Sequence, residues 1–340
     1  MRALNLRSIV TLLRAVFWCA LVSCVLVSIG CRGVQSSLDP AGSEAERMSK
    51  MFWLMTTGAI IVWLAVIVLA LWSVRTPPES NTHRRSRLII VGGGAIVPTL
   101  VLTALLIYGL EPIPALVAPA PEGSLKINVT GEQWWWRVRY LPPNGSEVVL
   151  ANEIHLPVGE PVEFRLDSPD VIHSFWIPSL AGKVDMIPGR VNRLVLNPTR
   201  TGVFRGVCAE YCGTSHALMA FNVVVQERAD FDRWLAAQAV PAQPATDPVA
   251  MRGQELFIAN GCSACHTIRG TAAAGVLGPD LTHVGSRLSL AAGTLGNEPD
   301  NYQRWIGHTE NVKPGVLMPP FPMLPANELQ AIAAYLDGLK

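Results

Sequence analysis

Two long stretches without charged side chains constrain the fold of this chain most. Residues 51–74 and 88–110 contain no Asp, Glu, Lys or Arg. A helix needs about 20 apolar residues to cross the hydrocarbon core of a bilayer, and each stretch is longer than that. Soluble proteins rarely bury helices that are so long and so apolar. We therefore expect a helical hairpin in the lipid bilayer, with two transmembrane helices joined by residues 75–87.

The connecting segment 75–87 indicates how the hairpin is oriented. It carries Arg75, Arg84, Arg85 and Arg87 against a single acid, Glu79. Segments rich in Lys and Arg stay on the cytoplasmic side of the membrane. Both ends of the hairpin then face outward, so the chain from residue 111 onward is expected on the periplasmic or extracellular side.

Residues 1–31 have the layout of a secretory signal. Three arginines are followed by an apolar run, which is the arrangement found in signal peptides. The segment resembles a bacterial lipoprotein signal, whose cleavage leaves a lipid-modified cysteine as the new N-terminus. Cys24 and Cys31 are the candidates for lipidation, and we prefer Cys31 because polar chain follows it at once. An uncleaved membrane anchor is the alternative.

Residues 111–228 show the two-residue periodicity of β-strands. Apolar side chains alternate with other residues in three runs: Leu125, Ile127 and Val129; Val162, Phe164 and Leu166; Phe221, Val223 and Val225. Strands of this kind, separated by Pro and Gly turns, predict an antiparallel sandwich or barrel.

The chain changes character after this β-rich region. Residues 229–248 are predicted to be a linker, because 240–248 is rich in Pro and Ala. In 249–340, the segment 249–259 is predicted to be helical. Leu329, Ile332, Ala333 and Leu336 recur at the spacing of one helix face. We expect a small all-α domain here.

Net charge and cysteine content restrict the classes of function that this chain can have. A net charge of +1 gives no support for a nucleic-acid partner. All seven cysteines can be placed without a disulfide, since three lie in the N-terminal segment and the other four form two short motifs.

The first of these motifs gathers soft metal ligands. Cys208, Cys212, His216 and Met219 lie within twelve residues. Thiolates and imidazoles select copper, zinc or iron–sulfur clusters over hard cations. A weak thioether ligand is typical of copper electron-transfer sites and unusual for structural zinc. A zinc site of two Cys and two His is the alternative.

This loop, C-x-E-x-C-G-x-x-H-x-x-M, resembles the binuclear copper (CuA) loop of cytochrome c oxidase subunit II. The segment 170–178 resembles the family's upstream strand, which contributes His173. The resemblance implies a cupredoxin sandwich with two copper ions. Cys208 and Cys212 would bridge them, His173 and His216 would each bind one, and the weak ligands would be Met219 and the Glu210 carbonyl. It also implies that the Glu210 side chain helps to bind a magnesium ion shared with the catalytic subunit.

The run from Gly131 to Trp136 resembles the aromatic strand of the same family. If the alternation that begins at Leu125 continues, Trp135 lies on the apolar face and Trp134 on the polar face. We therefore expect Trp135 to be a packing residue and Trp134 to be exposed. The resemblance makes Trp134 the point where electrons enter the copper domain.

The second cysteine motif, Cys262-x-x-Cys265-His266, is the attachment motif of c-type haem. Both cysteines would form thioether bonds to the haem, and His266 would bind its iron. The segment containing Met318 resembles the methionine-ligand segment of small c-type cytochromes, and Met318 is preferred over Met323. Pro279 lies in a turn that resembles the one whose proline carbonyl accepts the proton of the iron-binding imidazole.

From about residue 36 to its end, the chain resembles subunit II fused to a cytochrome c domain, as in caa-type haem–copper oxidases. The expected fold is a membrane α-helical hairpin, an all-β cupredoxin sandwich and an all-α c-type cytochrome domain. The resemblance implies an electron-transfer subunit of a respiratory terminal oxidase in the bacterial cytoplasmic membrane. Electrons would pass from cytochrome c through one covalent haem c and the dicopper centre to catalytic subunit I, which reduces oxygen to water. Other oxidase subunits are further expected partners.

Two alternatives remain at this point. The same relay could serve a nitric-oxide-reducing relative, or the chain could be a copper-delivery lipoprotein, against which the fused haem motif and two membrane helices argue. The chain also departs from the family in one place. The family often has a glutamate at the start of the second membrane helix, whereas residues 87–98 contain no acid.

Overall fold

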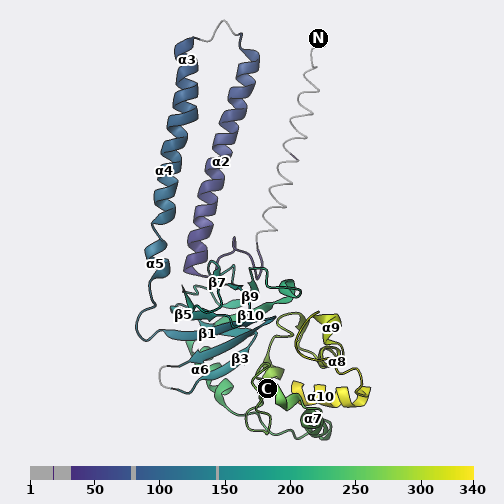
Figure 1. The fold of residues 1–340 in the computed structure, drawn as a ribbon. Helices are drawn as coiled ribbons and strands as arrows, with labels where there is room; N and C mark the ends of the chain where they lie inside the picture. Colours follow the sequence, from purple (N-terminus) through teal and green to yellow (C-terminus); the bar gives the residue numbers. More distant parts are fainter. Residues whose placement is uncertain (1–17, 19–31, 78–81, 143–144) are drawn as a thin grey trace, which may run out of the picture.

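The computed structural model describes Trp18 and residues 32–77, 82–142 and 145–340. Cys24 and Cys31, the two lipidation candidates, lie outside the described residues. Figure 1 shows three parts in chain order: a long helical hairpin, a β-domain at its base, and a small helical domain that lies against the β-domain away from the hairpin.

The hairpin matches the two apolar stretches of the sequence. Helix α2 spans Ser43–Arg75. The return arm consists of α3, His83–Arg87, a π-helix over Leu88–Ile96, and α4, Val97–Leu110. Both arms are long and apolar enough to cross a membrane. The short helix α5, Ile113–Val117, then leads to the β-domain.

Helix α2 begins inside the β-domain rather than at residue 51, where the apolar stretch starts. Ala41 and Ala45 are buried, and the Ala45 N–H donates to the Leu180 carbonyl at 3.3 Å. Between them, Gly42 lies directly against the backbone of Leu180, where a Cβ atom would collide. The first turn of the helix is therefore part of the β-domain's packing.

Two five-stranded sheets form the β-domain, as the predicted cupredoxin sandwich requires. The first sheet, in the order β3-β2-β1-β5-β8, contains Val148–Ala151, Trp135–Leu141, Leu125–Glu132, Val162–Asp167 and Asn192–Leu196. The second, in the order β4-β10-β9-β6-β7, contains Glu153–Pro157, Ala220–Gln226, Gly202–Cys208, His173–Trp176 and Val184–Met186. Most neighbouring strands are antiparallel, as expected from the sequence, but β1 pairs with β5, and β4 with β10, in parallel.

Aromatic side chains fill the space between the sheets. The rings of Phe175 and Phe221 stack at 4.9 Å, and Trp136 meets both edge-on at 5.7 and 5.1 Å. All three are fully buried. Large aromatic side chains contribute much of the apolar area in such cores, so this cluster holds the strands that carry the copper loop.

The predicted register of the tryptophan run is wrong. Strand β1 ends at Glu132 and β2 starts at Trp135, so the chain reverses at Gln133 and Trp134 and the alternation restarts. Gly131 pairs with Trp136, which points into the core, while Trp135 is half-buried beneath the Arg137 guanidinium. Trp134 is only 7% exposed, although it was expected to be exposed.

The predicted linker 229–248 is helical in its first half. Helix α6 spans Arg228–Ala239 and packs Phe231 and Trp234 against Tyr140 of β2. This helix therefore belongs to the β-domain, and only the following proline-containing segment connects to the helical domain.

The helical domain contains α7 at Pro248–Ala259, α8 at Pro299–Gly307, α9 at Thr309–Val312 and α10 at Ala326–Asp337. Two short strands, β11 at Ser289–Leu290 and β12 at Leu295–Gly296, form a small hairpin. Gly253 of α7 lies against the backbone of Ala331 in α10, a close approach that only glycine permits. The predicted core face of α10 is buried at Ile332, Ala333 and Leu336, and Leu329 packs at its edge.

Candidate metal centres

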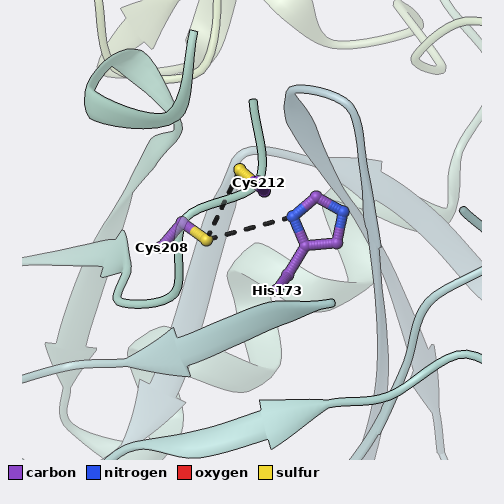
Figure 2. Close-up of side chains that lie close together, drawn as sticks. All are labelled: His173, Cys208 and Cys212. Carbon is purple, nitrogen blue, oxygen red and sulfur yellow. Dashed lines mark hydrogen bonds between the residues drawn. The ribbon is translucent and has the colours of Figure 1, made fainter. Parts of the chain in front are cut away.

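The copper-loop residues meet at one end of the second sheet. His173 begins β6 and Cys208 ends β9, two strands that pair beside each other. Cys212, His216 and Met219 follow in the loop that leads to β10. Figure 2 shows the His173 ring and the sulfurs of Cys208 and Cys212 directed toward one another. Strand pairing thus brings His173 to a loop that lies far from it in the sequence.

Six possible donor atoms form one connected group. The Sγ atoms of Cys208 and Cys212 are 3.8 Å apart. Cys208 Sγ lies 3.9 Å from His173 Nδ1 and 3.2 Å from the Glu210 carbonyl oxygen. Cys212 Sγ lies 3.5 Å from His216 Nδ1 and 3.8 Å from Met219 Sδ. All of the ligands expected from the sequence are therefore brought together.

A carboxylate fixes the orientation of His173. Its Nε2 hydrogen-bonds to Asp170 Oδ1 at 2.9 Å, so Nδ1 faces the thiols. The Gln133 N–H donates to Asp170 Oδ2 at 2.7 Å and holds the carboxylate in place. Burial opposes protonation of the fully buried His173, but its bonds to Cys208 and Asp170 outweigh this and raise its pKa. Such partners orient metal-binding histidines and tune them as ligands.

The two thiols cannot ionise independently. The hydrogen bond from Cys212, followed by that from His173, lowers the pKa of Cys208 to about 3. The same contact with Cys208, together with burial, raises the pKa of Cys212 far above that of an ordinary thiol. The two thiols therefore titrate as a pair. Soft cations suit this buried set of thiolates, imidazoles and a thioether.

The side chain of Glu210 pairs with a lysine. Its Oε2 lies 3.6 Å from Lys183 Nζ, and Lys183 also pairs with Asp185 at 3.1 Å. These side chains are about half exposed. In the described parts of the chain, only His173, Cys208 and Cys212 form a group of three or more His, Cys, Asp or Glu ligands. A magnesium ion at Glu210 would need further ligands from outside these residues.

The haem motif has a well-defined imidazole. His266 Nδ1 donates to the Pro279 carbonyl at 2.8 Å, which leaves Nε2 as the free ring nitrogen. A Cβ on Gly278 would lie 2.6 Å from His266 Cε1, so glycine lets the turn pass beneath the ring. Burial is the main reason that the pKa of His266 is lowered, which keeps the ring neutral. Cys262 and Cys265 are free thiols beside it. This arrangement fits a c-type haem.

The two candidate methionines differ in their surroundings. Met318 is half-buried and packs against the core of the helical domain, whereas Met323 is 71% exposed. The Thr309 hydroxyl also donates to the Met318 carbonyl at 3.1 Å and fixes the backbone there. The structure therefore favours Met318 as a residue facing the interior.

Sequence reasoning missed Lys313. Its side chain is only 2% exposed and lies between the helical domain and the copper loop. The partners of its ammonium group are backbone carbonyls on segments distant in sequence, and residue types carry no signal for such contacts.

Fold and sites together define a class: a membrane-anchored cupredoxin with a two-thiolate soft-metal loop, joined to a c-type cytochrome domain. Comparison with known families supports both parts. Residues 142–227 match the family described as cytochrome c oxidase subunit II, periplasmic domain, and residues 250–340 match the cytochrome c family.

Two relatives match nearly the whole chain. The chain is 32% identical to cytochrome c oxidase subunit 2 of Alkalihalophilus pseudofirmus, over 92% of this chain and 93% of that protein. It is 30% identical to the Bacillus subtilis protein of the same name, over 96% and 98%. Among solved structures, the periplasmic domain of subunit II of the Bradyrhizobium japonicum cytochrome oxidase is 31% identical, with a TM-score of 0.33, over 35% of this chain and 96% of that one.

The chain belongs to the cytochrome c oxidase subunit 2 family. It is therefore a membrane-anchored electron-transfer subunit of an oxidase complex, with its β-domain on the outer face. The subunit II domain implies copper and the cytochrome c domain implies haem. The resemblance and fold class expected from the sequence are confirmed.

Proposed function

We propose that this chain carries electrons from cytochrome c, by way of one covalent haem c and a dicopper centre, to catalytic subunit I of a terminal oxidase that reduces oxygen to water. One observation carries the proposal: Trp134 lies between the copper loop and the haem domain and contacts both. Both metal domains would lie on the outer face of the bacterial cytoplasmic membrane.

Named residues would hold each cofactor. Cys208 and Cys212 would bridge two copper ions, His173 and His216 would each bind one, and Met219 and the Glu210 carbonyl would be weak ligands. Cys262 and Cys265 would carry the haem, with His266 and Met318 as the iron ligands. When bound, these groups supply one-electron redox chemistry. A rigid, mixed set of soft ligands suits that role, because little needs to move when the charge changes.

The residues around the ligands keep this geometry fixed. Asp170 orients His173, and the Pro279 carbonyl orients His266. The Gln133 side chain and the Trp134 indole N–H both donate to the Cys212 carbonyl, at 2.7 and 3.0 Å. These two bonds tie the β1–β2 turn to the copper loop and hold the indole beside it.

Trp134 is the proposed point where electrons enter the copper domain. A Cβ on Gly213 of the copper loop would lie 2.9 Å from the indole, and one on Gly315 of the haem domain would lie 3.1 Å from it. Because both residues are glycines, the backbones of the copper loop and of the haem domain can both approach the Trp134 indole closely. The donor side of this path is the fused haem domain.

The Glu210 carboxylate is proposed as a ligand for magnesium at the contact with subunit I. Its side chain is 46% exposed, so a partner could supply the other ligands. Magnesium prefers oxygen ligands and few protein carboxylates. Lys183 now occupies the space beside it and would have to move.

The oxidase complex, purified with its catalytic subunit, tests the proposal. Reduced cytochrome c should support oxygen consumption and much slower nitric oxide consumption. Trp134→Leu should keep copper and haem content but slow flash-induced haem-to-copper electron transfer by roughly tenfold or more, and oxygen turnover with it. Trp135→Leu is the matched control, because that ring is half-buried and stacks with Arg137 instead.

A wild-type rate of haem-to-copper electron transfer in Trp134→Leu would show that this tryptophan only packs and does not carry electrons. Faster turnover with nitric oxide than with oxygen would overturn the assignment of the terminal acceptor.

A further inference from the structure

A single buried lysine connects the haem domain to the copper loop. Lys313 follows α9, and its Nζ donates to three carbonyl oxygens: Trp134 at 2.6 Å, Leu218 at 2.9 Å and Ala291 at 3.1 Å. The first belongs to the β1–β2 turn, the second to the copper loop and the third to the haem domain itself. An ammonium group has three N–H donors and no acceptor, so each donor has one carbonyl partner here.

This arrangement is unusual for a lysine. Lysine side chains are almost never fully buried unless they are paired, and Lys313 is 2% exposed. Among the described residues, no carboxylate lies within ion-pair distance of its Nζ. Burial lowers the pKa of Lys313 to about 7. The side chain is therefore held by hydrogen bonds to both domains, and the bonds to the Trp134 and Leu218 carbonyls exist only while the domains are together.

The lysine lies at the centre of a wider contact between the domains. The Ala220 N–H donates to the Ala292 carbonyl at 3.0 Å, and the Leu288 N–H donates to Glu153 Oε2 at 2.7 Å. Side-chain bonds surround these: Ser215 to the Pro314 carbonyl at 2.7 Å, Arg205 to the Gly293 carbonyl at 3.1 Å, and Asn222 to Ser289 at 2.8 Å. The haem domain is thus joined to the β-domain not only by the linker but also by hydrogen bonds around the copper loop.

Seating the haem domain also covers the tryptophan beside the copper loop. Trp134 is 7% exposed, with Gly315 and the Lys313 side chain against it on the haem-domain side. A separate donor protein could not touch this indole while the domain is in place.

We propose that Lys313 is a positioning residue that locks the haem domain onto the copper loop, and that the locked domain closes the Trp134 face to external donors. Electrons from an external protein then reach the copper loop only through the fused haem domain. The electron-transfer part rests on the proposed function, whereas the locked contact between the domains does not.

Lys313→Met in the full-length, metal-loaded chain tests the lock, because it keeps the length of the side chain and removes the donors. Hydrogen exchange of peptides that contain the Ala220 and Leu288 amides reports on the contact directly. We expect exchange there to rise by about tenfold or more, corresponding to a tenfold shift in the docking equilibrium. Peptides from α7 and α10, inside the haem domain, should be unchanged. Lys126→Met, at an exposed lysine of β1, is the matched control.

Kinetics separate positioning from a general structural role. In Lys313→Met, haem-to-copper transfer should slow by about tenfold, while reduction of the haem by external cytochrome c and the haem and copper absorbance bands stay as in the wild type. Direct reduction of copper by an external donor should become detectable. Altered absorbance bands would instead assign Lys313 to the fold of one domain and overturn the proposal.

A second variant guards against poor folding of the first. Arg205→Gln removes another cationic side chain that crosses the contact, and it should raise exchange at Ala220 in the same direction by a smaller factor. Wild-type exchange in both variants would overturn the lock. If exchange rises but the wild-type chain shows no haem-to-copper transfer, the proposed function fails while the lock stands.

Discussion

The copper site and the haem site are positioned by different parts of the chain. In the copper site, paired strands deliver His173 and Cys208, and a short loop adds Cys212, His216 and Met219. In the haem site, one turn holds Cys262, Cys265 and His266, and a separate irregular segment holds Met318. The proposed copper ligands thus lie on two paired strands and the loop that follows, whereas the proposed haem ligands lie on turns around a smaller helical core. Loss of one copper ligand should therefore leave the fold intact, and loss of Met318 should alter the iron without releasing the haem.

The strongest test of this comparison is Cys212→Ser. Removing one of two bridging thiolates should abolish dicopper binding and reduce oxidase turnover by roughly 100-fold or more, since even indirect partners of metal ligands contribute 10–100-fold. Haem incorporation should stay normal, because the haem ligands belong to the other domain. Copper per chain, near-infrared absorbance and haem absorbance measure this. Two copper atoms retained with unchanged absorbance would refute the ligand assignment.

Asp170→Asn tests whether hydrogen bonding pre-positions the copper ligands. The amide keeps the size of the side chain but removes the negative charge beside His173, so copper affinity should fall by about 10–100-fold. Competition with a copper chelator measures the affinity. Asp167→Asn, three residues earlier at the end of β5, is the control and should bind copper as the wild type does. Equal affinity in both variants would show that the sheet alone orients His173.

Met318→Ala tests the haem side of the comparison. The haem should stay attached through Cys262 and Cys265, while the reduction potential falls by on the order of 0.1 V, within the ~0.8 V range that axial ligands control. Redox titration and the weak absorbance band of methionine–iron ligation measure the change. Met323→Ala, at an exposed residue, should match the wild type. Loss of the band in Met323→Ala and its survival in Met318→Ala would reverse the assignment.

The smallest expected effect separates the two neighbouring tryptophans. Trp136→Leu removes a ring from the aromatic core and should destabilise the chain by roughly 2–4 kcal/mol. Trp135→Leu loses mainly a cation–π contact with Arg137, for about 0.5–1 kcal/mol. Denaturant unfolding followed through copper absorbance compares them. A larger loss in Trp135→Leu would contradict the strand register described here.

Local patterns made much of this molecule predictable from its sequence. The membrane hairpin follows from two uncharged stretches, and the copper loop places four proposed ligands within twelve residues. The α10 core face was found because helical periodicity is a property of the sequence alone. His173 required the resemblance to a family, since only strand pairing brings it to the loop.

Errors arose where distant segments decide the outcome. The alternation from Leu125 could not reveal that the chain reverses at Gln133 and Trp134, so the buried tryptophan was placed one position too early. Trp134 is covered by residues of another domain, which no strand pattern can show. Helix α6 was missed because its partner, Tyr140, lies far upstream. Lys313 bonds to carbonyl oxygens, which every residue possesses.

The buried start of α2 has a consequence for how the oxidase is assembled. Because Gly42 and Ala45 are packed against Leu180, the first turn of the first membrane helix is fixed to the β-sandwich. The height of the copper loop above the lipid and its rotation about the helix axis are therefore set within this one chain. When a catalytic subunit binds the hairpin, the orientation of the copper loop relative to that subunit is already fixed. A bulkier side chain at residue 42 would change that orientation and misalign the two subunits without altering a single ligand.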